Sequence, residues 1–221
     1  MHDRNNPPLP LLDQNKPTRL QTASFGMGCF WGAESVFGAL EGVIRTRVGY
    51  AGGSTESPTY RHLANHIETV QVDFEADLLP LPQLLTTFFK HHTPTNRLRK
   101  RQYTSALFYH SPEQQQLIQK VLQETEARLG QKVTIELLPF QTFTLAEERH
   151  QKWKLRRVPE LLREFEVLYP KFQEWNDSTA VARVNGYLGG FGKKEQFLEE
   201  LAALGLSYES QNLLLNQFQL L

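Results

Sequence analysis

The sequence is poor in cysteine, because only Cys29 among its 221 residues carries a thiol. A single thiol cannot form an intramolecular disulfide, so a disulfide-bonded secreted scaffold is excluded. Zinc and iron–sulfur sites that need several cysteine ligands are excluded too. Cys29 is therefore expected to be a buried inert thiol, a reactive thiol, or one half of an intermolecular bond.

The sequence also lacks a net charge and long apolar runs. Lys and Arg together number 24, as do Asp and Glu, so no overall charge directs the chain to nucleic acid or membranes. It has no apolar run of about 18 residues, and its N-terminus lacks a signal-peptide pattern. We therefore expect a cytoplasmic protein that binds neither membranes nor nucleic acid.

The first part of the chain divides into a tail and a patterned region. Four prolines fall within residues 1–22 and predict a disordered or extended tail. From residue 23 onwards, hydrophobic periodicity predicts strands and helices that alternate as β-α-β-β-α-β. The expected strands are 23–28, 43–50, 66–74 and 103–110, and the expected helices are 29–40 and 80–92. This order is that of the ferredoxin-like split βαβ arrangement.

The second part of the chain is less regular. A helix over 113–130 and a strand over 133–139 follow the predicted core. The sequence then becomes irregular and rich in aromatic residues, which predicts a coil-rich wrap with short helices. Residues 23–190 are expected to form the main domain, and residues 191–221 a helical extension. The predicted fold class is α+β, with two layers.

Cys29 lies where a predicted strand runs directly into a predicted helix. Unpaired N–H groups and the macrodipole at a helix N-terminus favour an anion, so we expect a lowered thiol pKa. Gly28 and Gly32 leave room for a ligand, and Phe30 and Trp31 supply an apolar pocket wall. The spacing alone is equally compatible with a small buried core residue.

Glu68 is an unusual residue in its predicted strand. It shares one face with Val70, Val72 and Phe74, and this face is expected to point inward. Desolvation raises the pKa of a buried carboxyl group and keeps its proton on. Glu68 is therefore a candidate site residue, the alternative being a side chain at the strand end that turns to solvent.

The motif GCFWGAE, followed by VGYAGG and PTY, closely resembles the A-type peptide methionine sulfoxide reductases. The likeness continues through HIETVQVDF, HTPT, QYTSALFY, AEERHQKW and NGYLGG, and covers about residues 23–190. The resemblance implies a ferredoxin-like fold. It also implies thiol-dependent reduction of methionine-S-sulfoxide, free or in proteins, and hence repair of oxidised proteins.

The resemblance implies a role for each matched side chain. Cys29 matches the nucleophile that attacks sulfur and becomes a sulfenic acid. Glu68 matches the glutamic acid that protonates the sulfoxide oxygen. The remaining matches would bind the substrate through hydroxyl groups or aromatic rings. Tyr60 and Tyr103 match the hydroxyls on the oxygen, Phe30 and Trp31 the methyl pocket, and Tyr187 a third tyrosine near the nucleophile.

Three positions depart from the pattern of this family. Thr93 stands where most members carry an aspartate that helps to bind the oxygen, and it keeps a hydroxyl but no charge. Arg149 replaces an aromatic or acidic residue. Leu188 occupies the position of a resolving cysteine. The chain therefore resembles the one-cysteine subgroup. It would need an external thiol, such as thioredoxin or glutaredoxin with glutathione, and no bound cofactor.

Two other features have ordinary explanations. His62 and His66 have the spacing of metal ligands on a helix, but the predicted strand begins at His66 and no acidic ligand completes a set. We therefore predict no metal. A basic loop, comprising Arg97, Arg99, Lys100 and Arg101, is either a solvated surface or a docking site for an acidic partner.

The leading hypothesis is a monomeric reductase with Cys29 as nucleophile and Glu68 as acid. The first alternative is a non-catalytic redox sensor or methionine-sulfoxide-binding module, favoured by the missing aspartate and the missing resolving cysteine. The second is a thiol peroxidase. That reading would need a Thr/Cys/Arg activation pattern around Cys29, where GCFWG supplies aromatic residues instead.

Overall fold

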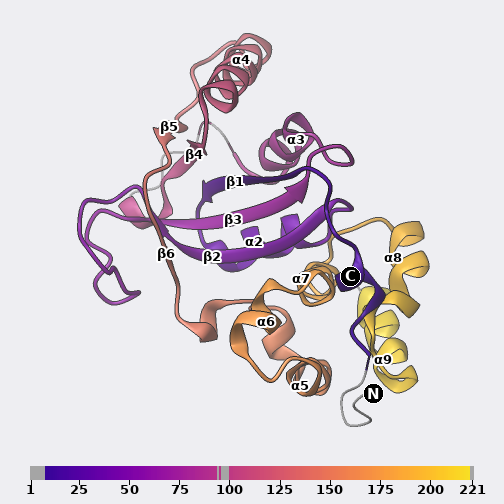
Figure 1. The fold of residues 1–221 in the computed structure, drawn as a ribbon. Helices are drawn as coiled ribbons and strands as arrows, with labels where there is room; N and C mark the ends of the chain where they lie inside the picture. The colour runs from indigo at the N-terminus through magenta and orange to yellow at the C-terminus, as the bar shows by residue number, and fades with distance from the viewer. Residues whose placement is uncertain (1–7, 94, 96–99, 220–221) are drawn as a thin grey trace.

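A six-stranded sheet organises the computed structural model of the chain, which describes residues 8–93, 95 and 100–219 (Figure 1). The predicted basic-loop residues Arg97 and Arg99 lie outside the described residues. The strand order is β5-β4-β1-β3-β2-β6. The bounds are β1 Leu20–Met27, β2 Val43–Ala51, β3 Ile67–Glu75, β4 Ser105–Tyr109, β5 Glu136–Pro139 and β6 Phe143–Leu145.

The four central strands confirm the predicted ferredoxin-like core. β1 lies between β3 and β4 and is antiparallel to both, and β2 pairs with β3 in the same sense. β5 extends the sheet parallel to β4, and β6 adds an antiparallel edge beside β2. β6 was not predicted, because a three-residue strand is too short to show a period of two.

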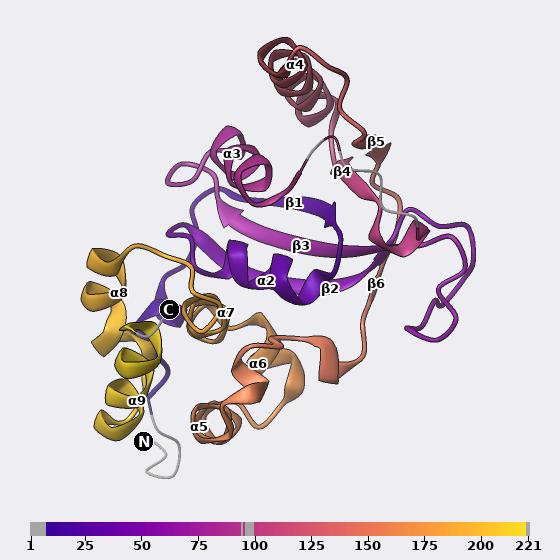
Figure 2. The same cartoon turned by 180° about the vertical axis from the view of Figure 1, so that it is seen from behind.

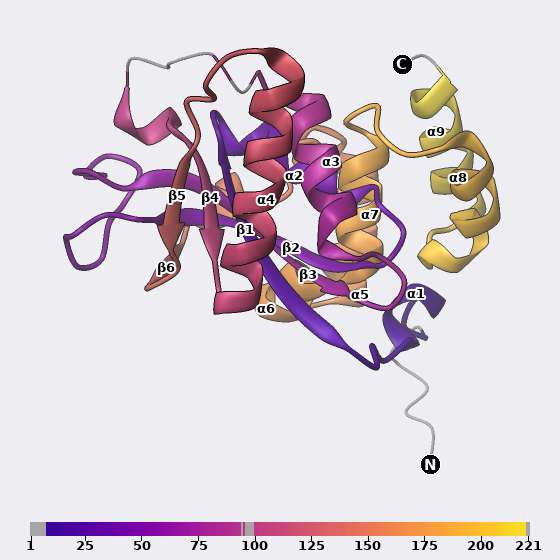
Figure 3. The same ribbon diagram turned by 90° about the horizontal axis from the view of Figure 1, so that it is seen from above.

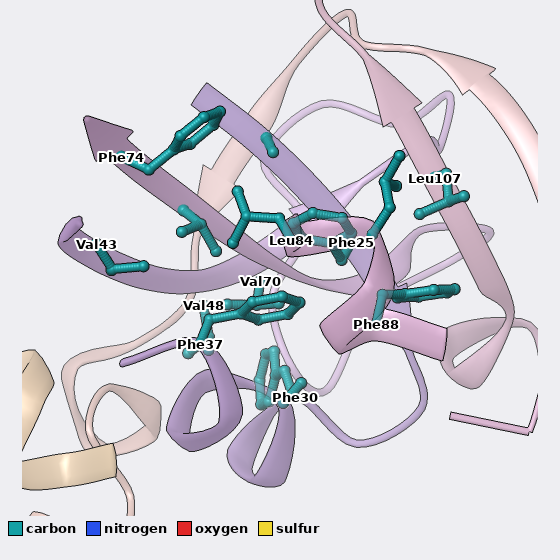
Figure 4. Close-up of a cluster of buried hydrophobic side chains, with 14 of the residues drawn as sticks. Phe25, Phe30, Phe37, Val43, Val48, Val70, Phe74, Leu84, Phe88 and Leu107 are labelled. Atoms are coloured by element: carbon teal, nitrogen blue, oxygen red, sulfur yellow. The ribbon is translucent and has the colours of Figure 1, made fainter. Parts of the chain in front are cut away.

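Helices α2 Phe30–Gly38 and α3 Leu81–His91 cover one face of the sheet, and α4 Pro112–Leu129 lies beyond α3 (Figures 1 and 2). Phe25 of β1 stacks on Phe37 with ring centroids 4.6 Å apart and on Phe88 with centroids 5.8 Å apart (Figure 4). The other face is covered near β4 by Phe140 and its neighbours. β3 is therefore buried along its whole length.

A second cluster of buried apolar side chains, drawn from residues 155–214, lies on the side of α2 that faces away from the sheet (Figure 3). Its helices are α5 Pro159–Leu168, α6 Phe172–Asp177, α7 Thr179–Tyr187, α8 Lys194–Glu200 and α9 Tyr208–Gln219. The two helices predicted in 191–221 are confirmed, and they complete this second cluster rather than standing apart. Within the described ranges, no helix is long and apolar enough to cross a bilayer.

Two glycines allow α7 to lie against α2. A Cβ atom on Gly38 would come within 2.4 Å of the Ala182 carbonyl oxygen. One on Gly186 would come within 2.3 Å of the Ala39 nitrogen. Any larger residue at either position would push the two helices apart, so the second cluster is held directly against the helix that begins beside Cys29.

Residues 8–22 do not form the expected disordered or extended tail. They include a short helix, α1 Leu11–Gln14, which Pro10 precedes at the cap, where its fixed φ is compatible with a helix start. Asp13 Oδ1 accepts the N–H groups of Thr179 at 2.5 Å and Ala180 at 3.3 Å. Its Oδ2 accepts the hydroxyls of Ser178 and Tyr169. This carboxylate therefore caps α7, a long-range contact that proline content does not reveal.

Asp13→Ala should destabilise the protein by at least about 1–2 kcal/mol, because it removes a charged cap from a helix N-terminus. The measurement is the free energy of unfolding in urea. Asp13→Asn is the matched control. It keeps one acceptor oxygen and should lose less stability. An unchanged free energy of unfolding for Asp13→Ala would show that this cap contributes nothing.

Candidate active site

Cys29 is the N-cap residue of α2 and is exposed to solvent. The preceding Gly28 has φ +85°, a left-handed conformation that lets the chain turn from β1 into the helix. A Cβ on Gly32 would meet no atom within 4 Å, so the space beside that residue is open. A ligand can therefore approach the thiol from the helix side.

The lowered thiol pKa expected from the helix N-terminus is wrong. Partial burial raises the pKa of Cys29, and the nearby charge of Glu68 raises it further. The backbone N–H groups of Trp31 and Gly32 bond to the sulfur and lower the pKa, as the helix N-terminus predicts, but by less. Desolvation outweighs these hydrogen bonds because the protein covers the inner side of the thiol, although the outer side can be reached from solvent.

Glu68 reaches the site from β3, and its predicted inward position is confirmed. Glu68 as a whole is 1% exposed to solvent. Oε2 accepts the N–H of Phe30 at 3.1 Å, and Oε1 accepts the side-chain amide of Gln102 at 3.1 Å. Burial raises the Glu68 pKa more than these two hydrogen bonds lower it, which confirms the predicted direction. Gln102 was not predicted as a site residue, because no local pattern in the sequence distinguishes it.

Tyr60 and Tyr103 join the same site. Tyr103 belongs to the short helix η1 Arg101–Tyr103, and its hydroxyl shares a hydrogen bond with Tyr60. Burial raises the Tyr103 pKa, and the proximity of Glu68, Tyr60 and Cys29 raises it further. The structure thus brings the four predicted catalytic residues together, although they come from four separate segments.

An aromatic wall stands beside Cys29, formed by Phe30, Trp31, Tyr60, His150 and Trp153. Trp31 stacks on Trp153 with ring centroids 3.8 Å apart and planes 5° apart. The Trp31 Nε1–H donates to His150 Nδ1 at 3.1 Å. The His150 ring also lies 5.5 Å from Phe30 and 4.7 Å from Tyr60. His150 and Trp153 belong to the AEERHQKW motif, but no role was predicted for either residue.

Glu147 connects the aromatic wall to the sheet. Its Oε2 accepts the hydroxyl of the buried Tyr50 at 2.7 Å, and its Oε1 accepts the N–H of Tyr60 at 3.2 Å. Burial would raise the Glu147 pKa, but hydrogen bonds from its own N–H, from Tyr50 and from Tyr60 lower it overall. An ionised carboxylate is therefore built into the site, and the sequence analysis did not single it out.

A fully buried ion pair lies beneath the aromatic wall. Lys152 Nζ donates to Glu34 Oε1 at 2.8 Å, the Thr46 carbonyl oxygen at 2.7 Å and Asn176 Oδ1 at 2.9 Å. The backbone N–H of Lys152 also donates to Glu34 Oε2 at 2.6 Å. Both side chains have no exposed surface. Because Glu34 lies on α2, this pair fixes the segment that carries His150 and Trp153 against the helix that Cys29 caps.

Tyr187 and Leu188 lie in the second cluster, and Thr93 follows α3. The prediction that Tyr187 lies near the nucleophile is wrong, because its ring packs on Phe197 in the second cluster and its hydroxyl donates to Glu200 of α8. Leu188 is 9% exposed and packs in the same cluster. Thr93 is exposed just after α3 ends, and its substrate-binding role stays a prediction.

His62 and His66 do not form a pair on a helix. His62 is exposed in a turn and bridges to Thr59. His66 is buried at the start of β3, where its Nε2 lies 2.9 Å from the Thr55 carbonyl oxygen. No group of three or more potential metal ligands occurs among the residues that the structure describes.

The comparisons with known proteins agree with this geometry. Residues 21–182 match the family described as "Peptide methionine sulfoxide reductase". The chain belongs to this family. It is 41% identical over 192 residues to the peptide methionine sulfoxide reductase of Drosophila melanogaster, with 84% of this chain and 75% of the fly protein covered. The resemblance found in the sequence is thereby confirmed.

Further peptide methionine sulfoxide reductases support the assignment. The MsrA of Acidobacterium capsulatum is 41% identical over 146 residues, covering 61% of this chain and 94% of its own length. Mxr1 from Saccharomyces cerevisiae in reduced form is 28% identical, with a TM-score of 0.59 over 65% of this chain and 88% of Mxr1. Methionine sulfoxide reductase A of Corynebacterium diphtheriae is 29% identical, with a TM-score of 0.58 over 70% and 87%.

Glu68→Gln should lower the pKa of Cys29, because it removes the negative charge beside the thiol while keeping a side chain of the same shape. The measurement is the pH dependence of Cys29 alkylation by iodoacetamide, whose midpoint should move to lower pH. Glu124→Gln, on the exposed face of α4, is the control and should leave the midpoint in place. A midpoint that stays or rises in Glu68→Gln would contradict the proximity of the two groups.

Proposed function

We propose that this chain reduces methionine-S-sulfoxide, free or within proteins, to methionine, and so repairs oxidised proteins. The observation that carries the proposal is the meeting of a solvent-reachable thiol with a buried carboxyl group of raised pKa. Membership of the family supports it. The S epimer is proposed because one type of enzyme serves each sulfoxide epimer.

In the proposed first step, Cys29 Sγ attacks the sulfoxide sulfur and Glu68 gives a proton to the oxygen. The sulfur–oxygen bond of the substrate breaks, and the oxygen passes to Cys29 as a sulfenic acid. The substrate sulfur gains two electrons and leaves as methionine, while the Cys29 sulfur loses two. The raised pKa of Glu68 keeps its proton available at a higher pH than an ordinary glutamic acid would.

Five other side chains would hold the substrate during this step. The hydroxyls of Tyr60 and Tyr103 lie on the Glu68 side of the site and can donate to the sulfoxide oxygen as charge develops there. The half-buried Trp31 would offer aromatic surface to the methyl group, and Phe30, which is 1% exposed, would support the wall from the core side. Thr93 is proposed to contribute its hydroxyl in place of the usual aspartate.

Regeneration is proposed to need a thiol from outside the chain, because Cys29 is the only cysteine. The external thiolate would attack the sulfenic sulfur, release water and form a mixed disulfide, which a second thiol would reduce. Thioredoxin, or glutaredoxin with glutathione, would supply these thiols. We propose that the protein works as a monomer in the reducing cytoplasm, where such thiols are present. It is proposed to need no bound cofactor or metal.

The proposed function is tested by turnover of each purified methionine sulfoxide epimer with dithiothreitol. Multiple turnovers of the S form alone are expected, and Cys29→Ser should abolish them. Replacing dithiothreitol by thioredoxin, or by glutaredoxin with glutathione, identifies the reductant. A folded wild-type protein that leaves the S form intact would refute the proposal. Sulfenic acid formation without repeated turnover would instead favour the redox-sensor alternative.

Glu68→Gln should slow the first step by about 10²- to 10⁴-fold, the usual contribution of a positioned general acid. The measurement is single-turnover formation of methionine in the absence of reductant, as a function of pH. In the wild type the rate should fall as pH rises through the raised Glu68 pKa, because the acid form is lost. That fall should be missing from the variant. Equal rates in both proteins would remove Glu68 from the role of acid.

A further inference from the structure

His150 lies between two side chains that can only donate hydrogen bonds. The Trp31 Nε1–H points to Nδ1 at 3.1 Å, and Arg149 Nε lies 3.2 Å from Nε2. A neutral imidazole has one donor and one acceptor nitrogen, so it can accept from only one of them. Burial and the charge of Arg149 lower the His150 pKa, which favours this neutral form.

The more buried contact decides the tautomer. Trp31 is half-buried, and indole has no other way to satisfy its N–H than to donate it. With Nδ1 as acceptor, Nε2 carries the proton and faces Glu147 Oε2, 3.8 Å away. The Nε2–H of His150 and the Nε–H of Arg149 are then both donors, so they cannot form a hydrogen bond with each other. The guanidinium is therefore left without a hydrogen-bond acceptor at His150.

Glu147 does not neutralise Arg149 effectively. The nearest approach of Arg149 to this carboxylate is 3.7 Å, from Nη2 to Oε1, which is longer than a hydrogen bond. Both carboxylate oxygens already accept hydrogen bonds from Tyr50 and Tyr60. The Arg149 side chain is 61% exposed, and exposed pairs of this kind contribute only about 0–1 kcal/mol. Its cationic head remains available to an anion.

A second guanidinium lies on the same aromatic wall. Arg157 is exposed, and its Cζ lies 5.5 Å from the centre of the Trp153 ring, which stacks on Trp31. The ion pairs found among the described residues do not include Arg157. The outer edge of the wall therefore carries two cationic side chains, one next to His150 and one over Trp153.

We propose that Arg149, with Arg157 adding positive charge to the same aromatic wall, forms a carboxylate-binding subsite that selects methionine sulfoxides with an acidic residue two positions away in a peptide chain. The inference rests on the proposed function, because it places the sulfoxide side chain against the aromatic wall. In an extended peptide, side chains two positions apart point to the same face and lie about 6.6–6.8 Å apart along the chain, so the side chains two residues from the sulfoxide face the outer edge of that wall. An Asp or Glu there would receive a charge-assisted hydrogen bond from Arg149.

The substrate is favoured over the external thiol as the source of the carboxylate. The aromatic wall is the surface expected to receive the sulfoxide side chain itself, and the two arginines border that wall. A reductant need reach only the sulfenic sulfur at Cys29, which is open beside Gly32. An anionic thiol that uses Arg149 is therefore kept as an outcome of the test.

The test uses acetylated and amidated pentapeptides with a central methionine-S-sulfoxide and with Asp or Asn at both terminal positions, two residues from the sulfoxide. Dithiothreitol serves as an uncharged reductant. The wild-type kcat/KM should be about three- to tenfold higher for the Asp peptide, mainly through KM, and high salt should reduce this ratio. Arg149→Gln should bring the ratio to about one, and Arg149→Lys should keep part of it. Arg163→Gln, on the exposed face of α5, is the control and should keep the wild-type ratio.

Peptide binding to Cys29→Ser, followed by tryptophan fluorescence, gives the same Asp-to-Asn ratio without turnover. A binding preference without turnover in the wild type would refute the proposed reaction and support the subsite. A ratio of one in the wild type, or one that Arg149→Gln leaves intact, would overturn the subsite. It would also be overturned if Arg149→Gln slowed only sulfenic acid reduction by glutathione, relative to dithiothreitol.

Discussion

The buried ion pair between Glu34 and Lys152 is the interaction on which the site depends. It joins α2 to the segment that supplies His150 and Trp153 to the aromatic wall, and neither side chain has any exposed surface. Removing one partner of such a pair leaves an uncompensated buried charge and costs about 3–5 kcal/mol. At its N-terminus, α2 is joined to the sheet by the hydrogen bond from the Phe30 N–H to Glu68 of β3. The nucleophile thus lies at the start of a helix that is fixed to two different parts of the protein, and the aromatic wall is attached to the same helix.

Burial governs the protonation of the site more strongly than the helix N-terminus does. It raises the pKa of the Cys29 thiol and of the Glu68 carboxyl group alike, although each also receives backbone hydrogen bonds that favour its anion. Each of these two anions would also disfavour the other. Cys29 and Glu68 therefore each keep their proton to a higher pH than the free side chains would. Such an arrangement suits a reaction in which oxygen leaves the substrate and must be protonated, and it keeps the exposed thiol less reactive in the absence of a substrate.

Much of the fold could be predicted from local patterns, because periods of two and 3.6 residues identify strands and helices over a few turns. The alternation around Glu68 revealed its burial for the same reason. What the sequence could not show are partners from distant segments: Gln102 on Glu68, Glu147 on Tyr60, and Asp13 on α7. The position of Tyr187 was wrong because the resemblance carried no information about α8, whose Glu200 takes its hydroxyl. The direction of the Cys29 pKa was wrong because it depends on a balance between opposing effects that only the structure sets.

The second cluster has a consequence for how this protein can be divided. The family match covers residues 21–182, yet the apolar residues that face α7 include Phe197, Leu204 and Leu214, and the cap of α7 is Asp13. All four lie outside the matched range. A piece cut at those limits would end inside α7 itself and would lose both the Asp13 contact and the apolar side chains that cover this helix. The exposed apolar surface would be of the kind that drives self-association. The region that matches the family is therefore a catalytic unit in this chain without being a separable folding unit. A chimera or fusion built from it would have to include the flanking helices.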